Sequence, residues 1–209
     1  MRPAIETTAE GARFYITPSG LKVPSATTIV GDLLRRRELE RWMQRMGPSS
    51  DRERDEAAGR GKRVHQAIAR CLRDPAWEPP PHLEGYVQAA GAALRWTGTR
   101  PLFVEQAIVS EGLKVGGTID LLGRSAEGWV VLDWKTSKRP YPEHGLQLGI
   151  YALLAEAELG IPVAQGLVVV LGRDGTWRAH QVDLERAKAA GRHLIALWWL
   201  LRGPIYLEG

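Results

Sequence analysis

The segment Val163–Leu171 constrains the fold more than any other part of the chain, because its strand pattern is apolar on both faces. Such a strand is buried in its sheet, as in a parallel pair joined by a crossover helix. The amphipathic pattern from about His144 to Leu159 predicts that helix immediately before it. After the segment, Gly172–Gly175 predicts a turn into an edge strand, and the chain closes with a predicted helix from about Leu184 to Leu201.

Three strand patterns precede the crossover helix and are separated by turn residues. They cover Pro101–Val109, Leu113–Leu122 and Gly128–Trp134. Short connections between consecutive strands favour an antiparallel meander, to which the crossover adds a parallel strand. The predicted fold class is therefore α/β, with a mixed central sheet flanked by helices.

The N-terminal part of the chain carries a small hairpin and mainly helical patterns. Pro18–Gly20 supplies the turn of the hairpin, and Ser25 and Thr27 can cap the helix that follows. Helices are predicted over about Ser25–Met46, Asp51–Arg73 and Leu83–Trp96. This N-terminal helical region precedes the predicted sheet.

The 209 residues contain no repeat and no low-complexity block, so we expect one domain. In that domain, residues 1–98 form the hairpin and a basic helical region, and residues 99–209 form the α/β core. The single cysteine, Cys71, excludes a disulfide framework, a Cys₄ zinc site and a four-cysteine iron–sulfur cluster. A metal must therefore be held by oxygen and imidazole. No run approaches the roughly 18 apolar residues of a membrane span and no signal peptide is recognisable, so we expect a cytoplasmic protein.

Basic charge is concentrated between Gly31 and Arg73, where twelve Lys and Arg residues accompany seven Asp and Glu residues. Arginine outnumbers lysine 22 to 6 in the whole chain. The guanidinium fork suits phosphate oxygens, although a GC-rich genome produces the same bias. These basic helices are the candidate track for a nucleic-acid backbone. The sequence contains no asparagine, which fits a thermophilic source.

Two charged residues, Asp133 and Lys135, lie in the segment Trp129–Lys135, whose apolar pattern is typical of a buried strand. Alternate side chains of a strand share a face, so Asp133 and Lys135 are neighbours on the side opposite Trp134. Burying them is costly unless they pair with each other, with a metal or with a substrate. The alternative for such a short pattern is an edge strand with an exposed salt bridge.

A second carboxylate, Asp120, lies in the preceding strand of the same hairpin. If the register places it opposite Val131 or Asp133, both carboxylates face the same side, whereas a slip of one residue separates them. Neighbouring like charges repel unless a cation intervenes, which favours a hard divalent ion. We therefore expect removal of Asp120 to stabilise the metal-free protein by relieving repulsion. Gly116 and Gly117 either let a DNA backbone or a phosphate approach that strand or form a bulge.

Short motifs in a fixed order carry a resemblance to a known family. They are P-S-A-T-T-I at 24–29, G-K-R-V-H at 61–65, I-D at 119–120, L-D-W-K at 132–135 and Q-L-G-I-Y at 147–151. Together they resemble the PD-(D/E)xK nuclease superfamily and, within it, the RecB-like exonuclease branch with its small phage and mitochondrial members. Ala26 replaces the usual valine of the first motif, Ile119 replaces the usual proline, and the cysteine cluster of some relatives is absent.

The resemblance implies a restriction-endonuclease-like core with a cation site. Asp120 and Asp133 would bind Mg²⁺ or Mn²⁺ directly, with the carbonyl of Trp134 as a third ligand. His65 would add an imidazole ligand, whereas its alternative role is an ordinary polar contact. Lys135 would orient or deprotonate the attacking water and offset charge on the phosphorane.

The resemblance also implies DNA contacts from Ser25, Thr27, Gln147 and Tyr151. Gln147 and Tyr151 share one helical face, so the amide could hold a water or phosphate while the tyrosine stacks on a base or bonds a phosphate. The alternatives are helix packing for this pair and helix capping for Ser25 and Thr27. Glu105 either supports the metal ligands indirectly or lies at the surface.

The expected function is a metal-dependent DNA exonuclease that acts on single-stranded ends in replication, recombination or repair, with proteins of those processes as candidate partners. An arch of basic helices would admit a strand only by threading, whereas an open groove would favour the alternative, a structure-selective endonuclease. A catalytically silent DNA-binding module is a further alternative. The intact set of Asp120, Asp133 and Lys135 argues against it. The sequence lacks a G-x-x-x-x-G-K-[ST] loop, which argues against a nucleotide-binding enzyme.

Overall fold

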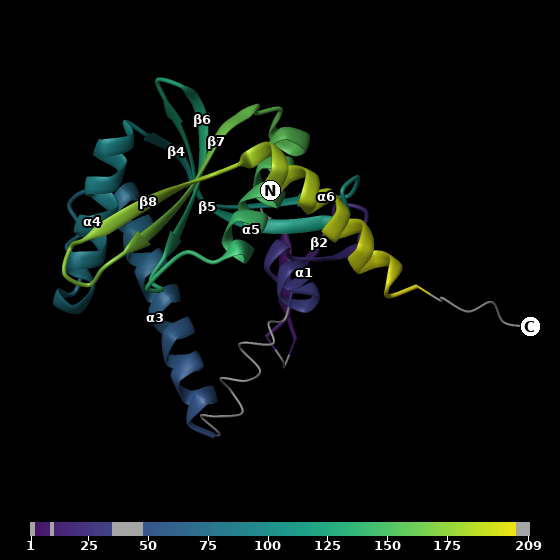
Figure 1. Ribbon diagram of the computed structural model, residues 1–209, viewed down its shortest axis with the longest axis horizontal. Helices are drawn as coiled ribbons and strands as arrows, with labels where there is room; N and C mark the ends of the chain where they lie inside the picture. Colours follow the sequence, from purple (N-terminus) through teal and green to yellow (C-terminus); the bar gives the residue numbers. More distant parts are fainter. Residues whose placement is uncertain (1–2, 9–10, 35–47, 204–209) are drawn as a thin grey trace, which may run out of the picture.

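The computed structural model describes residues 3–8, 11–34 and 48–203. Its helices are α1 (Ala26–Leu33), α3 (Pro48–Arg73), α4 (Pro81–Thr97), α5 (Pro142–Leu159) and α6 (Leu184–Leu200). Its strands are β1 (Ala4–Thr7), β2 (Arg13–Ile16), β3 (Lys22–Pro24), β4 (Arg100–Ser110), β5 (Val115–Ser125), β6 (Gly128–Lys135), β7 (Val163–Leu171) and β8 (Trp177–Val182). Figure 1 shows the longer strands fanned between two groups of helices. None of the described helices is long and apolar enough to cross a membrane.

The five C-terminal strands form one mixed sheet in the order β4-β5-β6-β7-β8. The strands β4, β5 and β6 are antiparallel neighbours, β6 and β7 are parallel, and β8 runs antiparallel to β7 at the edge. The helix α5 connects the parallel pair, as a crossover between parallel strands requires. The structure therefore confirms the predicted α/β class with a mixed sheet flanked by helices.

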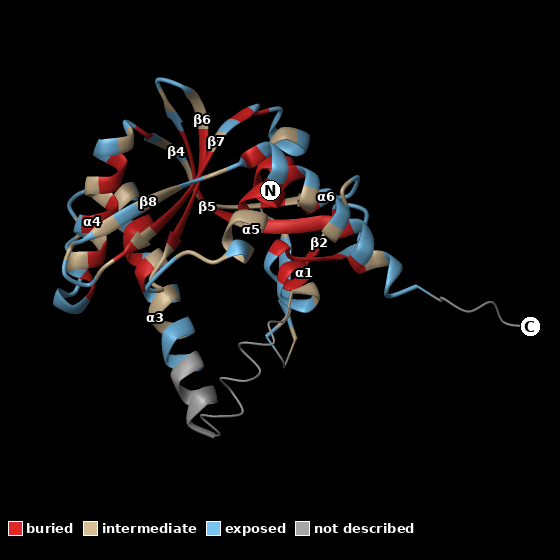
Figure 2. Ribbon diagram, viewed as in Figure 1, coloured by how far each residue is buried: buried red, intermediate tan, exposed pale blue. Residues whose placement is uncertain are grey.

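Each face of this sheet is covered by its own helices, so the strands between them are largely buried (Figure 2). On one face, α1, α5 and α6 enclose an apolar cluster that includes Val131 and Val168. On the other face, α3 and α4 enclose a second cluster that includes Leu132 and Val169. Alternate residues of β6 and β7 thus enter different cores, which explains why β7 is apolar on both sides.

A smaller sheet of β1, β2 and β3 packs against β5. The buried Tyr15 joins them, because its hydroxyl forms a hydrogen bond of 2.8 Å with Thr118 Oγ1. A Cβ added at Gly116 would lie 2.4 Å from the Tyr15 ring, and one added at Gly117 would lie 2.6 Å from the Tyr151 ring. The protein's own aromatic rings fill the space that was expected to admit DNA. Both glycines also pair in continuous register with β4, so they form no bulge.

The first helix ends earlier than the sequence pattern predicts. The helix α1 stops at Leu33, and residues 35–46 of the predicted helix lie outside the described residues. Its start is as expected, because the Ser25 side chain caps it. The indole N–H of Trp198 in α6 donates to Asp32 Oδ2 at 2.9 Å, which fixes the C-terminal end of α1 against the core.

Candidate active site

The β5–β6 hairpin places the two predicted carboxylates side by side. In the β5–β6 ladder Leu121 pairs with Leu132 and Leu122 with Val131, and Asp120 and Asp133 are the next residue of each strand. The charge of Asp120 acts on Asp133, because the two carboxylates lie near each other. Because β6 lies between β5 and β7, the alternative of an edge strand with an exposed salt bridge is wrong.

Asp133 is buried and depends on Lys135 for its charge pairing. The carboxylate is 1% exposed, and the Lys135 ammonium donates to its Oδ1 at 2.7 Å. Its Oδ2 lies 2.5 Å from the same nitrogen but accepts no well-aligned hydrogen bond. Burial, together with the nearby charge of Asp120, raises the pKa of Asp133 to about 6, although Lys135 acts in the opposite direction. Asp133 is therefore a buried carboxylate with unused acceptor capacity.

Asp120 is also buried but is held by two donors. The backbone N–H of Trp134 donates to its Oδ2 at 2.9 Å, and His65 Nδ1 lies 3.2 Å from its Oδ1. Burial alone would raise the pKa of Asp120, but the charge and hydrogen bond of His65 outweigh it and lower the pKa below its ordinary value. The protein thus keeps Asp120 ionised without a cation.

His65 reaches the site from α3. Its neighbour Val64 is fully buried in the core beneath α3 and α4, which orients the helix and sets His65 beside the end of β6. His65 Nε2 lies 2.8 Å from the carbonyl oxygen of Trp134 and donates to it. Burial would lower the pKa of His65, yet Asp120 raises it to about 9. The ring therefore carries a positive charge at neutral pH in the metal-free protein.

Glu105 joins this group from β4. Its Oε1 lies 3.9 Å from His65 Nδ1, and one ligand atom each from His65, Glu105 and Asp120 lies within 4.8 Å of the other two. Burial, followed by the charge of Asp120, raises the pKa of Glu105. The sequence left the place of Glu105 open, and the structure shows that it faces the predicted metal ligands.

The donor set matches a hard divalent cation. It consists of carboxylate oxygens, one backbone carbonyl and one imidazole, which suit Mg²⁺ or Mn²⁺. Asp133 Oδ2 is a buried acceptor without a hydrogen bond, and such atoms call for an explanation such as an ion. The residues present therefore fit the cation that the sequence motifs imply.

The four predicted DNA-contact residues lie together, but two of them are buried. Gln147 donates to the Tyr151 hydroxyl at 2.5 Å and to Thr27 Oγ1 at 3.4 Å, and Thr27 is exposed. Tyr151 is 3% exposed and its ring packs against Gly117, so the ring does not present a free face on which a base could stack. Ser25 is equally buried, and its hydroxyl accepts from the Thr28 N–H as the helix cap.

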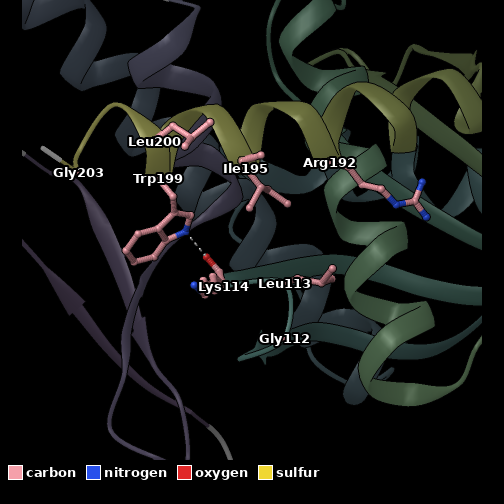
Figure 3. Close-up of a pocket in the computed structure, with 9 residues that line it drawn as sticks. Gly112, Leu113, Lys114, Arg192, Ile195, Trp199, Leu200 and Gly203 are labelled. Atoms are coloured by element: carbon pink, nitrogen blue, oxygen red, sulfur yellow. Dashed lines mark hydrogen bonds between the residues drawn. The ribbon is translucent and has the colours of Figure 1, made fainter. Parts of the chain in front are cut away.

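A cavity of about 680 Å³ lies elsewhere, between α6 and the turn that joins β4 to β5. Figure 3 shows Leu113 and Ile195 at this cavity and the Trp199 indole donating to the carbonyl oxygen of Lys114 at 2.9 Å. The residues that line it include none of the predicted site residues. The carboxylate site is therefore separate from this cavity.

The family of the chain follows from a comparison with family models. The model of the PD-(D/E)XK nuclease superfamily matches residues 34–198, which include every site carboxylate and Lys135. The chain belongs to the PD-(D/E)XK nuclease superfamily. This membership confirms the resemblance of the sequence motifs at the level of the superfamily, and the mixed sheet is the restriction-endonuclease-like core that a PD-(D/E)XK nuclease is expected to have.

Curated proteins that this PD-(D/E)XK chain resembles share one name. Mitochondrial genome maintenance exonuclease 1 of Homo sapiens is 29% identical over 210 residues, which cover 89% of this chain and 58% of that protein. The protein of the same name from Mus musculus is 29% identical over 89% of this chain and 59% of its own length. The protein of the same name from Xenopus tropicalis is 28% identical over 86% of this chain and 56% of its own length. The chain thus spans somewhat more than half the length of these relatives.

Proposed function

We propose that this chain is a metal-dependent deoxyribonuclease that hydrolyses phosphodiester bonds from the ends of single-stranded DNA, in replication, recombination or repair. The observation that carries the proposal is the grouping of Asp120, Asp133 and Lys135 at one end of the buried β5–β6 hairpin. The exonuclease name of the relatives supports action on DNA ends, and the order of the sequence motifs supports the RecB-like branch.

The proposed cofactor is Mg²⁺ or Mn²⁺, held by Asp120, Asp133, His65 and the carbonyl oxygen of Trp134. Asp133 has the most to gain from the ion, because burial penalises its charge and one of its oxygens lacks a hydrogen bond. A bound divalent cation lowers the pKa of water and offsets negative charge on a phosphate. The imidazole donor favours Mn²⁺ relative to an all-oxygen site.

Lys135 is the proposed residue that handles the attacking water. Its ammonium is fixed by Asp133 at 2.7 Å, and the side chain remains 18% exposed, so it is positioned yet open to solvent. From there the ammonium can orient a water for in-line attack and stabilise the charge that develops on the phosphate. The expected product carries a 5′-phosphate. Asp120 is in turn oriented by Trp134 N–H and His65.

Thr27 and Gln147 are the proposed contacts to the DNA backbone. Thr27 is exposed on the first turn of α1, and its hydroxyl lies 3.4 Å from the Gln147 amide of α5. Ser25 contributes indirectly, because its cap fixes the turn that carries Thr27. Tyr151 contributes through its hydroxyl, whose pKa is raised by burial, so that it stays neutral and holds the Gln147 amide.

The test uses one DNA sequence in two forms, a linear single strand labelled at one end and a covalently closed circle. Each is incubated with Mg²⁺, with Mn²⁺ or with EDTA. We expect degradation of the linear strand with either cation, survival of the circle and no cleavage in EDTA. Nicking of the circle at a comparable rate would establish the endonuclease alternative. Binding without cleavage in both cations would establish a silent module, and cleavage in EDTA would contradict metal dependence.

A further inference from the structure

We infer that Glu105 is a direct ligand of the divalent cation, together with His65 and Asp120. The inference rests on the proposed metal-dependent function and extends it to a residue that lies in none of the motifs by which the chain resembles its superfamily. It rests on ligand separations, on the orientation of the imidazole and on the backbone that presents the Glu105 carboxylate.

The separations between ligand atoms suit one small cation. His65 Nδ1 lies 3.2 Å from Asp120 Oδ1 and 3.9 Å from Glu105 Oε1, and one ligand atom of each residue lies within 4.8 Å of the other two. Two ligands bonded to one ion at about 2.0–2.1 Å are separated by roughly 3–4 Å, depending on the angle between the bonds. The three side chains can therefore close on a single ion with small adjustments.

The orientation of the imidazole supports the same set. His65 Nε2 donates to the Trp134 carbonyl oxygen at 2.8 Å, so in the neutral ring the free lone pair is on Nδ1, which faces Asp120 and Glu105. A ligating histidine commonly donates its other N–H to a carbonyl or carboxylate, which fixes its tautomer. The carbonyl oxygen has a second lone pair, so this hydrogen bond leaves Trp134 able to bind the cation as well.

The backbone of β4 presents Glu105 to Asp120. The residues on either side of Glu105 pair with Leu121 and Ile119 of β5, so Glu105 lies across from Asp120. Its φ of 51° is in the left-handed region, which residues other than glycine rarely adopt. Strained conformations of this kind persist where the surrounding structure enforces them, and they cluster at ligand sites.

A surface salt bridge does not account for Glu105. Its carboxylate is 30% exposed, and in the part of the chain that the structure describes its ion-pair contact is to His65. Arg13 and Arg73 lie near enough to act on its charge, but the Arg73 guanidinium donates to the Val104 carbonyl oxygen at 2.5 Å. The carboxylate therefore faces the metal ligands and stays open to solvent, as an accessible cation ligand must.

The first test measures Mn²⁺ binding by isothermal titration calorimetry on wild type, Glu105→Gln and Glu111→Gln. Glu111 is the matched control, because the same substitution falls in the turn that follows β4, where the carboxylate accepts from the Ser19 hydroxyl. We expect Glu105→Gln to weaken Mn²⁺ binding about tenfold or more while the control binds like wild type. Equal affinity of Glu105→Gln and wild type would overturn the inference.

The second test distinguishes direct from indirect ligation. In crystals soaked with Mn²⁺, an anomalous difference map should place a Glu105 oxygen about 2.0–2.6 Å from the ion. A water between the carboxylate and the ion would overturn direct ligation. Asp120→Ala separates this inference from the proposed function. Loss of binding in Asp120→Ala with retained binding in Glu105→Gln refutes only the inference, whereas absence of binding in wild type refutes both.

Discussion

Asp120 and Asp133 lie near each other in one hairpin and are both buried, yet their surroundings have opposite effects on their charges. Asp120 accepts from the Trp134 N–H and faces a positively charged His65, and its pKa is lowered although burial acts to raise it. Asp133 has Lys135 beside it but keeps an oxygen without a hydrogen bond, and burial raises its pKa to about 6. The hydrogen-bond donors around each carboxylate, rather than the degree of its burial, therefore determine which of the two is stabilised in its charged form without a cation.

The comparison separates two sides of the site. On the Asp120 side, His65 and Glu105 complete a compact group of ligand atoms. On the Asp133 side, Lys135 supplies an ammonium that is both fixed and partly exposed. We therefore expect loss of Lys135 to act mainly on turnover, loss of His65 to act mainly on cation affinity, and substitutions of the two carboxylates to change metal-free stability in opposite directions.

The largest expected effect is on turnover. Lys135→Ala should lower cleavage of an end-labelled single strand by about 10²-fold or more, because a positioned charge that faces the reacting phosphate is lost. DNA affinity, measured by fluorescence anisotropy, should stay within a few-fold of wild type. Lys138→Ala, in the exposed segment after β6, is the matched control and should cleave normally. Wild-type turnover in Lys135→Ala would refute the proposed role.

The next effect is on cation affinity. His65→Ala should raise the Mn²⁺ concentration required for half-maximal cleavage by about tenfold or more, and activity should partly return at high Mn²⁺, because one ligand of several is lost. His82→Ala, on the exposed surface of α4, serves as the control. An unchanged Mn²⁺ dependence in His65→Ala would show that His65 makes only a polar contact.

Metal-free stability should change in opposite directions for the two carboxylates. Asp120→Ala should lower the free energy of unfolding in EDTA by about 1–3 kcal/mol, because the buried Trp134 N–H loses its acceptor. Asp133→Asn should raise it at pH 8, since the raised pKa of Asp133 means that its charge opposes folding above about pH 6. Urea titrations in EDTA measure both. Stabilisation by Asp120→Ala would contradict the account.

A smaller effect concerns pH. Because the pKa of His65 is raised from 6.5 to about 9 in the folded protein, its protonation contributes stability that is fully present below about pH 6.5 and is lost as the pH rises through about 9. The destabilisation caused by His65→Ala in EDTA should therefore be larger at pH 6 than at pH 9.5. An equal difference at both pH values would show that the ring contributes through packing alone.

The sequence predicted the elements whose pattern is local and periodic. The strand β7 has the predicted bounds, and α5 and α6 differ from prediction by at most two residues, because apolar periodicity and turn residues mark them. The strand β1 was not predicted, since all of its residues are exposed and no apolar alternation identifies them. The end of α1 was also missed, because its C-cap lacks the glycine that commonly marks such an end.

The features of the site also divide into those that the local sequence pattern predicts and those that depend on tertiary contacts. The shared face of Asp133 and Lys135 follows from strand alternation alone. The surroundings of Asp120 do not, because they depend on a helix 55 residues earlier in the chain that brings His65 beside it. For this reason the structure leads us to predict the opposite effect of removing Asp120 from the one that the sequence predicts. Glu105 could not be placed either, since its position depends on the β4–β5 register and on one left-handed residue.

The most direct test of the account is the rate of single-strand cleavage against Mn²⁺ concentration, for wild type and Asp120→Ala, with folding of both proteins checked by circular dichroism. Asp120 groups with His65 and Glu105 and its charge also acts on Asp133, so its loss should remove cleavage even where the fold survives. We expect a rate that saturates with Mn²⁺ in wild type and no measurable cleavage by Asp120→Ala at any concentration. Cleavage by wild type in EDTA, or wild-type turnover in Asp120→Ala, would refute the proposed cation site.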